Sequence, residues 1–548
     1  MTERKESKIK FVSFHGHSTA GSISDALGYP DEHVDLAYNN GLQGMAFTEH
    51  GNMNSVSYSF LKSKKMKKEG KDDFRILYGI EAYVHPSISS WKEEKEKIAL
   101  DKKLSKQIDK ATQTLNENES ETKTKQRNPL NKRGHLVLVA SNEIGLKNLF
   151  TLTSLSYVGD NFYRYPRMDF EMLKKYNEGI IVSSACMGSI SSIEYWENKD
   201  KGDSAVLAGM EKVFGNLQDI FGDRFYGELQ WARNIDQMRI NSFIVQLSKQ
   251  MGFELLSTVD SHFPDPTKWK DREIYKTLGW LGKKGLADNL ELPNSLEEME
   301  FQLYPKNGDE LYSSYKNFSK ELGFSFNDVL VLDSIERTYD IMCNKIDNFE
   351  INSDVKLPSF VVPPGETADS AIEKIAYQGL KQKGLHRNKE YLKRMKRELD
   401  FVKEKKFSQY FLATKSIVDL AKEEMLVGIS RGSASGSILA YLLGITNIDS
   451  LKYNLPFERF LNNAGGFPDI DLDFSDNKKM KNMCIERFGK ENVAFISNFN
   501  TLQPKSLIKD ISKLYSVPFT EVNEVTTKMI NEAKPEAKKK NEILAGAY

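Results

Sequence analysis

The sequence predicts an α/β protein whose first half forms a parallel β/α sheet or barrel and whose second half is mainly helical. Short apolar runs, each followed by a longer stretch of helical character, recur through the first 265 residues. This alternation is typical of parallel strands joined by helices. Beyond about residue 286 the apolar periodicity is mostly helical. The length of 548 residues leaves room for about three or four domains.

The composition is that of an ordinary globular protein. Hydrophobic residues make up 39% of the chain, and 77 Lys and Arg residues balance 77 Asp and Glu residues. This excludes collagen-like, wholly disordered and globally basic nucleic-acid-binding proteins. It does not exclude a local basic patch. The three cysteines are far apart, so we expect no disulfide framework and a reducing cytoplasm. We also expect no signal peptide and no membrane partner, since no apolar run approaches the roughly 20 residues that cross a bilayer.

Six apolar runs are the expected strands of the first half, at residues 10–14, 44–48, 75–84, 135–140, 179–183 and 253–259. Between the third and fourth runs, residues 91–134 are highly charged and almost free of aromatic residues. We expect this segment to be an inserted surface excursion, partly helical and partly disordered, with a basic arm touching DNA as the alternative.

The second half is expected to be helical with one extended connector. Residues 356–370 contain several prolines, each of which disfavours helix in the residue before it. A basic run at 380–407 predicts a charged helix, stabilised by pairs four residues apart or placed to grip phosphates. The last forty residues are again helical in character.

Metal-ligating residue types stand at the ends of the apolar runs. His15 and His17 close the first run, and side chains two apart on a strand point to the same face. The other runs bring Glu49, His50, Glu81, His135, Cys186, Asp260 and His262. Taken singly, each could be a satisfied core histidine or a capping carboxylate, as we expect for His33 and His85. As a set at the ends of barrel strands, they predict a site for Zn²⁺, Mn²⁺ or Fe²⁺. Two or more ions there would clamp a phosphoester.

The motifs HGHS, TEHGN, GIEAYV, the run ending at Cys186 and VDSH resemble the PHP domain. They are most similar to the PHP domain of bacterial C-family replicative polymerases, the DNA polymerase III alpha subunits. The resemblance implies a distorted parallel barrel, up to three metal ions and a 3′–5′ exonuclease. It implies these ligands: His15, His17, His50, Glu81, His135, Cys186, Asp260 and His262. Asp25 is a further candidate, one residue later than the family position, which Ser24 occupies. Glu49 replaces the usual Asp, so its support of the ligands is expected to differ.

Two motifs of the second half predict a phosphate site. LVGISRGSASGSILAYLL, at 426–443, is a loop of small residues that runs into an apolar helix. Its glycines allow close approach of a phosphate, and Arg431 adds a fork of donors; a tight turn capped by Ser433 is the alternative. Farther on, Asp469, Asp471 and Asp473 alternate with apolar residues and would share one face of a strand. Oxygen ligands of this kind suit Mg²⁺, and an exposed acidic turn is the alternative.

These two motifs resemble the palm of C-family polymerases, whose nucleotidyltransferase core is similar to that of polymerase beta. The resemblance implies that Asp469 and Asp471 are two of three catalytic aspartates. It also implies that Gly432, Ser433 and Arg431 hold the triphosphate of a dNTP, with Arg459 as a further phosphate contact. One departure is that Ile429 and Ser430 replace a Pro and a Gly before Arg431, so the entry to the loop is expected to differ.

The expected domains are a PHP domain at 1–285, a palm with a helical connector at 286–500 and the start of a thumb at 501–548. The resemblance implies replication of primer–template DNA with dNTP and contacts with replisome components. The third catalytic aspartate is expected on a later strand. The chain is therefore expected either to be truncated or to need a second polypeptide carrying the rest of the palm, the fingers and the C-terminal domains. The alternatives are a stand-alone PHP phosphoesterase acting on a small molecule and a non-catalytic replisome scaffold.

Overall fold

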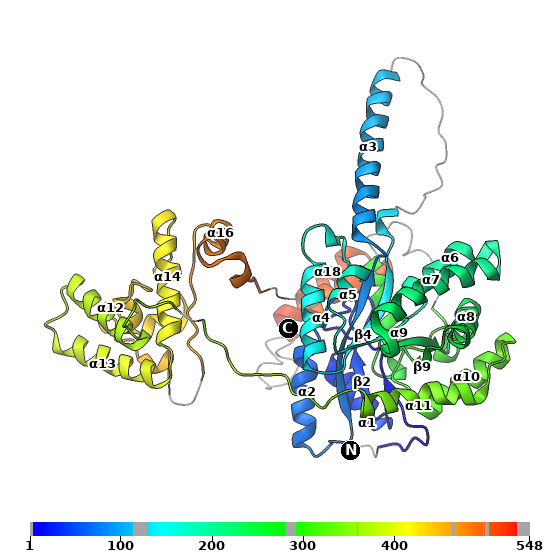
Figure 1. Cartoon of the computed structure of the whole chain (residues 1–548). Helices are drawn as coiled ribbons and strands as arrows, with labels where there is room; N and C mark the ends of the chain where they lie inside the picture. The colour runs from blue at the N-terminus through cyan, green and yellow to red at the C-terminus, as the bar shows by residue number, and fades with distance from the viewer. Residues whose placement is uncertain are drawn as a thin grey trace. The chain divides into compact units, whose positions relative to one another are not determined.

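The computed structural model describes residues 4–112, 129–280, 292–358, 360–462, 466–496, 498 and 503–533. The chain divides into two compact units, which are described separately (Figure 1). Unit 1 comprises Met1–Ile351 with Leu502–Tyr548, and unit 2 comprises Asn352–Thr501. Among the described residues, no helix combines the length and the apolar character needed to cross a membrane.

Unit 1 is built around a seven-stranded sheet in the order β1-β2-β3-β4-β7-β8-β9. These strands are β1 (Val12–Ser13), β2 (Gly44–Phe47), β3 (Arg75–Val84), β4 (Gly134–Ala140), β7 (Ile180–Ser183), β8 (Phe225–Gln230) and β9 (Glu254–Thr258). A parallel bridge between Gly16 and Ser261, just beyond β1 and β9, brings the two edge strands together. The sheet is therefore nearly closed, which confirms the predicted barrel.

One strand departs from the expected parallel arrangement. β4 is antiparallel to both β3 and β7, whereas β1–β2, β2–β3, β7–β8 and β8–β9 are parallel. A parallel partner needs a connection that crosses back over the sheet. The chain after β3 instead forms α3 (Ile88–Thr112), which stands away from the rest of unit 1 (Figure 1). The excursion expected at 91–134 is thus helical up to Thr112, and 113–128 lie outside the described residues.

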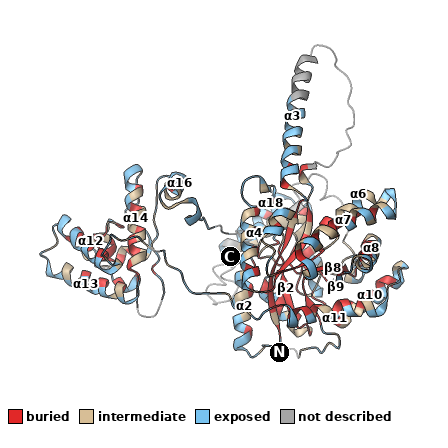
Figure 2. Cartoon of the chain, in the orientation of Figure 1, coloured by how far each residue is buried: buried red, intermediate tan, exposed pale blue. Residues whose placement is uncertain are grey.

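Helices cover the outside of the sheet. They are α1 (Pro30–Asn39), α2 (Val56–Lys68), α4 (Glu143–Ser156), α5 (Phe170–Lys175), α6 (Ile190–Asn198), α7 (Asp203–Phe221), α8 (Ile235–Met251), α9 (Trp269–Trp280), α10 (Gly308–Leu322) and α11 (Asp328–Asn344). The C-terminal helices α17 (Pro504–Leu514) and α18 (Phe519–Lys528) also belong to this unit. Figure 2 shows the strands buried beneath helices whose outer faces are exposed.

Alternate residues of each strand enter two different cores. Met45 and Phe47 of β2 pack outward against the helices, while Ala46 points into the barrel. The barrel interior is completed by Ile341 and Met342 of α11. Met342 lies beside Gly44, where β2 begins, so α11 fills the end of the barrel at which the parallel strands start. The opposite end, where these strands finish, is left for polar side chains.

The described part of unit 2 is mainly helical. Its elements are α12 (Ala368–Gln382), α13 (Lys389–Glu404), α14 (Ser408–Glu424), η8 (Gly432–Gly436), α15 (Ile438–Leu442), η9 (Phe457–Arg459), α16 (Asn477–Phe488) and η10 (Lys490–Asn492). The expected connector has no helix until Thr367 caps α12, and Ser359 lies outside the described residues. The basic run predicted as one helix breaks between α12 and α13, because Gly384 takes a left-handed φ of 70° there.

Candidate functional site

The polar end of the barrel gathers the predicted ligands around one carboxylate. Glu81, on β3, is fully buried. One of its oxygens lies 2.9 Å from His135 Nδ1 and 3.3 Å from His15 Nε2, and the other lies 2.6 Å from His50 Nδ1. Cys186 Sγ is 3.5 Å from both Glu81 Oε1 and His135 Nδ1. Residues from four separated stretches of chain thus meet at Glu81.

Asp260 is a second meeting point. Its Oδ1 atom lies 3.3 Å from His15 Nε2, 3.2 Å from His17 Nε2 and 3.4 Å from His262 Nδ1. Asp260 follows β9 with a φ of 58°, a left-handed conformation that is uncommon for a residue with a side chain. Backbone strain of this kind is concentrated at functional sites, where the surrounding structure holds it.

Asp25 also reaches the cluster, although it is displaced by one residue from the family position. Its Oδ2 atom lies 3.2 Å from His50 Nε2 and 3.8 Å from His262 Nε2. Ser24, which occupies the usual position, is exposed. The loop after His17 therefore turns so that the carboxylate, rather than the hydroxyl, faces the imidazoles.

The donor set fits divalent cations. Three groups of ligand atoms each lie within 4.8 Å of one another: His17, His50 and His262; His15, His17 and Asp260; His50, Glu81 and His135. Within the cluster, six buried atoms have no hydrogen-bond partner in the described structure, although several face an ion-pair partner: His15 Nε2, His17 Nε2, His50 Nδ1, Asp25 Oδ1, Glu81 Oε2 and Asp260 Oδ1. A buried polar atom without a partner costs free energy of folding, and a cation coordinated by several of these atoms would remove that cost.

The ionisation of the cluster is consistent with this fit. Burial lowers the pKa of His17 well below its usual value and that of His262 to about 3, so both imidazoles keep free lone pairs. Burial alone would raise the pKa of Glu81, but the neighbouring histidines, His135 first, bring it well below the usual range. The pKa of His50 is raised against the effect of burial, mainly by Glu81. A bound cation would take the place of the proton on such a histidine.

Two buried carboxylates support the cluster: Glu49, whose support was expected to differ from that of an Asp, and Glu228, which the sequence did not reveal. Glu228, on β8, accepts hydrogen bonds from His15 Nδ1 at 2.7 Å and from Thr258 Oγ1 at 2.5 Å. Glu49 accepts from Ser22 Oγ at 2.7 Å, and that hydroxyl lies 3.0 Å from His17 Nδ1. Each carboxylate therefore fixes the orientation of one histidine, as supporting groups do around metal ligands.

The strand that carries Glu228 was itself missed. Its sequence, FYGELQ, interrupts the apolar pattern with Gly227 and Glu228. All six residues are nevertheless buried, because the polar side chains point into the barrel. The alternation of Tyr226, Glu228 and Gln230 on one face was the signal that could have revealed it.

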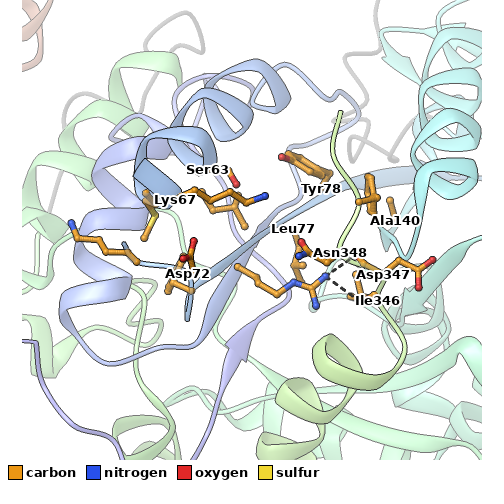
Figure 3. A pocket seen from close by; sticks show the side chains of 15 residues that line it. Ser63, Lys67, Asp72, Leu77, Tyr78, Ala140, Ile346, Asp347 and Asn348 are labelled. Atoms are coloured by element: carbon orange, nitrogen blue, oxygen red, sulfur yellow. Dashed lines mark hydrogen bonds between the residues drawn. The ribbon is translucent and has the colours of Figure 1, made fainter. Parts of the chain in front are cut away.

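One cavity of unit 1 lies apart from this cluster. A cavity of about 330 Å³ lies at the start of β3, with Ser63, Lys67, Asp72, Tyr78 and Asn348 among its lining residues (Figure 3). The guanidinium of Arg75 in this cavity donates to the carbonyl oxygens of Met342 at 2.6 Å and Asp347 at 2.8 Å. Arg75 therefore caps the end of α11, and this cavity contains none of the predicted ligands.

In unit 2, the predicted phosphate loop and the aspartates lie side by side. Gly432, with a φ of 66°, opens η8, and a Cβ atom added to it would be 2.2 Å from Asp471 Oδ2. Arg431 Nη1 is 2.9 Å from Asp473 Oδ1. Only glycine allows Asp471 to approach the loop this closely, so the geometry explains the residue type at 432.

The aspartate segment alternates as predicted but forms little strand. Asp469 and Asp471 are exposed, while Ile470 packs against the core of unit 2. Backbone pairing in the described residues is limited to the bridge between Val427 and Phe474 and its flanking hydrogen bonds. The prediction of a regular strand is therefore wrong for the described residues, although the carboxylates still share one face.

The remaining palm candidates, Ser433 and Arg459, make no comparable contact with the aspartates in the described residues. Ser433 follows Gly432 in η8 and is half-buried. Arg459 is exposed at the end of η9, and no hydrogen bond or ion pair seen in the described residues joins its side chain to Asp469 or Asp471. The structure thus brings Arg431, Gly432 and Asp471 together and leaves Arg459 apart.

A buried carboxylate that the sequence did not reveal holds the loop in place. Glu398, on α13, accepts hydrogen bonds from the backbone N–H groups of Ile438 at 3.1 Å and Leu439 at 2.9 Å. It also accepts from Ser437 Oγ at 2.8 Å and pairs with Arg394 at 2.6 Å. These contacts fix the point at which the small-residue loop becomes α15, since they satisfy the free N–H groups of its first turn.

Comparison with known proteins finds a family match in each half of the chain. The sequence model of the PHP domain matches residues 13–232, and that of the bacterial DNA polymerase III alpha NTPase domain matches residues 370–546. The DNA polymerase III subunit alpha of Aquifex aeolicus is 31% identical over 93% of this chain and 40% of its own length. That of Borreliella burgdorferi is 31% identical over 95% of this chain and 40% of its own length.

The chain spans about two fifths of the length of these relatives. Among solved structures, an amidohydrolase from Chromobacterium violaceum is 12% identical and covers 48% of this chain and 96% of its own, with a TM-score of 0.26. The two domains occur in the expected order, and the polymerase relatives cover nearly the whole chain. The chain is therefore a DNA polymerase III alpha-type N-terminal region in which a PHP domain precedes the polymerase NTPase domain.

Proposed function

We propose that the cluster at the barrel end is a metal-dependent phosphodiesterase centre that removes nucleotides from a DNA 3′ end. The observation that carries this proposal is the convergence of six unpartnered buried atoms on one end of the barrel. The proposed ligands are His15, His17, Asp25, His50, Glu81, His135, Cys186, Asp260 and His262. Up to three Zn²⁺, Mn²⁺ or Fe²⁺ ions fit this mixed set of nitrogen, oxygen and sulfur donors.

Bound ions would supply a hydroxide nucleophile and stabilise the charge on the phosphate. The protein itself orients the ligands and controls their protons. Glu228 accepts the hydrogen on His15 Nδ1, so His15 Nε2 is left facing Glu81 and Asp260. Full burial of His15 and Glu81 keeps bulk water from competing for these atoms.

We further propose that unit 2 forms part of a polymerase active site that adds dNTP to the 3′ end of a primer on template DNA. Asp469 and Asp471 would hold Mg²⁺, while Gly432, Ser433 and Arg431 would bind the triphosphate, with Arg459 as a further phosphate contact. The close approach of Asp471 to Gly432 supports this arrangement.

A degradation assay tests the exonuclease. The purified chain with Mn²⁺ is given a primer–template with a 5′ label and a mismatched 3′ end. We expect stepwise shortening that is lost in the double variant His15→Ala, His17→Ala and retained in His386→Ala, which changes a histidine of unit 2.

The outcomes separate the alternatives. Hydrolysis of phosphorylated metabolites without any action on DNA would replace the proposal with a small-molecule phosphoesterase. If the metal-loaded chain degraded neither substrate, the cluster would be structural, and a scaffold role would be favoured if the metal-stripped chain still joined its replisome partners.

A further inference from the structure

An arginine packs against two tyrosine rings beside the proposed metal cluster. Arg133 directly precedes β4, and its guanidinium carbon lies 3.4 Å from the centre of the Tyr165 ring and 4.9 Å from that of Tyr83. Its Nη1 atom donates to the carbonyl oxygen of Asn131 at 3.1 Å, whereas its Nε is buried and has no hydrogen-bond partner in the described structure. The two rings meet each other edge-to-face, with centroids 5.3 Å apart, so the guanidinium packs over Tyr165 and beside Tyr83. Its Nη2 atom makes no hydrogen bond seen in the described residues and remains free to donate.

This stack borders the ligands directly. The Tyr83 ring meets the His135 ring edge-on, with centroids 5.2 Å apart, and lies nearly parallel to the His50 ring at 6.3 Å. Tyr83 and His135 are also paired across β3 and β4. The Tyr83 ring therefore contacts both the guanidinium of Arg133 and two of the proposed ligands.

The outer side of the stack faces solvent. Tyr165 begins β6 (Tyr165–Pro166), which pairs with β5 (Phe162–Tyr163) in a short hairpin. Arg164, at the hairpin tip, is exposed and takes a left-handed φ of 61°. Tyr165 is 38% exposed, whereas the nearby Arg167 is 1% exposed. A ligand can therefore reach the Tyr165 side of the stack but not Arg167.

We propose that Arg133 and Tyr165 form a subsite for the strand that leads into the metal cluster, binding a second phosphate upstream of the one cleaved. This inference rests on the proposed function. A guanidinium fork matches the oxygens of a phosphate, and an exposed tyrosine face stacks a base without sequence preference. The ligand class is thus a single-stranded oligonucleotide end with at least two phosphates, rather than a simple phosphate ester.

The test compares two substrates in the full-length chain. The variants are Arg133→Gln, Arg133→Lys and, as a matched control, Arg239→Gln, which removes an arginine of α8 that pairs with Asp203. A 5′-labelled oligonucleotide carries many phosphates, while bis(p-nitrophenyl) phosphate carries one phosphodiester and cannot reach the subsite. We expect Arg133→Gln to lower kcat/KM on the oligonucleotide about tenfold, mainly through KM. Hydrolysis of the small diester should stay at the wild-type rate, and Arg133→Lys should recover part of the loss.

A binding measurement keeps this test separate from the proposed exonuclease. Anisotropy of a labelled single strand gives the dissociation constant at several salt concentrations. The slope of the logarithm of affinity against the logarithm of salt should fall by about 0.7 in Arg133→Gln, as for one lost phosphate contact. An unchanged slope, or an equal loss on both substrates, would overturn the subsite. A wild-type chain that hydrolysed neither substrate would refute the exonuclease alone, since the binding slope would still decide about Arg133.

Discussion

Replacing Glu228 by Gln tests whether this carboxylate sets the orientation and charge of a metal ligand. Glu228 Oε1 accepts from His15 Nδ1 at 2.7 Å, from Thr258 Oγ1 at 2.5 Å and from Gln230 Nε2 at 3.0 Å. An amide oxygen could still accept these bonds, and the amide NH₂ would face the hydroxyl of Ser183, which can turn to accept. The fold should therefore survive, while the negative charge behind His15 is lost.

The expected effect on metal affinity follows from that loss. Hydrogen bonds to a charged acceptor are roughly twice as strong as neutral ones, and removing a partner of this kind from a ligating histidine weakens metal binding about 10- to 100-fold. This corresponds to about 1.4 to 2.8 kcal/mol for the ion that His15 holds. Competition titration of Zn²⁺ against a chromophoric chelator measures the change directly.

The control is Glu197→Gln, which changes an exposed glutamate that pairs with Lys132 at 2.8 Å. Its metal affinity should equal that of the wild type. Thermal melting in the presence of a chelator then shows whether Glu228→Gln folds normally without metal. Equal Zn²⁺ affinity in Glu228→Gln and the wild type would refute the reasoning, as would a loss of affinity that only accompanies unfolding.

Three further predictions concern His33, Glu398 and Gly432. Burial lowers the pKa of His33 to about 4. Between about pH 6.5 and 4, His33 is therefore protonated in the unfolded chain and neutral in the folded chain. The free energy of unfolding should fall by about 3 kcal/mol as pH drops over this range. Urea unfolding at several pH values should show this slope in the wild type and not in His33→Gln. Glu398→Ala removes the carboxylate that pairs with Arg394 Nε and that accepts from the first N–H groups of α15, so the urea-unfolding free energy of unit 2 should fall by about 3–5 kcal/mol. Gly432→Ala places a Cβ atom against the Asp471 carboxylate and should weaken Mg²⁺-dependent binding of dATP, measured by titration calorimetry.

Control variants are available for Glu398→Ala and Gly432→Ala. Glu404 is exposed on the same helix as Glu398, and Glu404→Ala should change stability by less than about 0.5 kcal/mol. Gly384 has a φ of 70°, close to that of Gly432, but nothing within 4 Å of an added Cβ atom. Gly384→Ala should therefore introduce a similar backbone strain without weakening the binding of dATP. Equal loss of dATP binding in both glycine variants would contradict the proposed clash with Asp471.

Much of the barrel and its cluster could be predicted from the sequence because most of the strands are short apolar runs that can be recognised without knowledge of their partners. Apolar runs such as 75–84 and 135–140 became β3 and β4, and the ligand types at their ends meet as expected. The strand order of a barrel then brings His15 and Asp260 together without any further signal. Their roles as metal ligands remain predictions.

What the sequence did not reveal depends on long-range partners. The direction of β4 is set by where α3 leads the chain, and hydrophobic periodicity carries no information about direction. Glu228 and Glu398 read as ordinary acids, because their importance lies in donors that are distant in sequence, such as His15 and Ile438. A buried carboxylate is recognisable only when the groups that satisfy it are known.

The contact between Gly16 and Ser261 has a consequence for biosynthesis. It links the first and last strands of the barrel, and the backbone N–H of His17 donates to the carbonyl oxygen of Ser261 across it. The proposed ligands on both sides of this junction are separated by most of the domain's length. During translation, therefore, the cluster cannot assemble until His262 has left the ribosome. An ion bound at that stage would stabilise the contact between the first and last strands of the newly closed barrel.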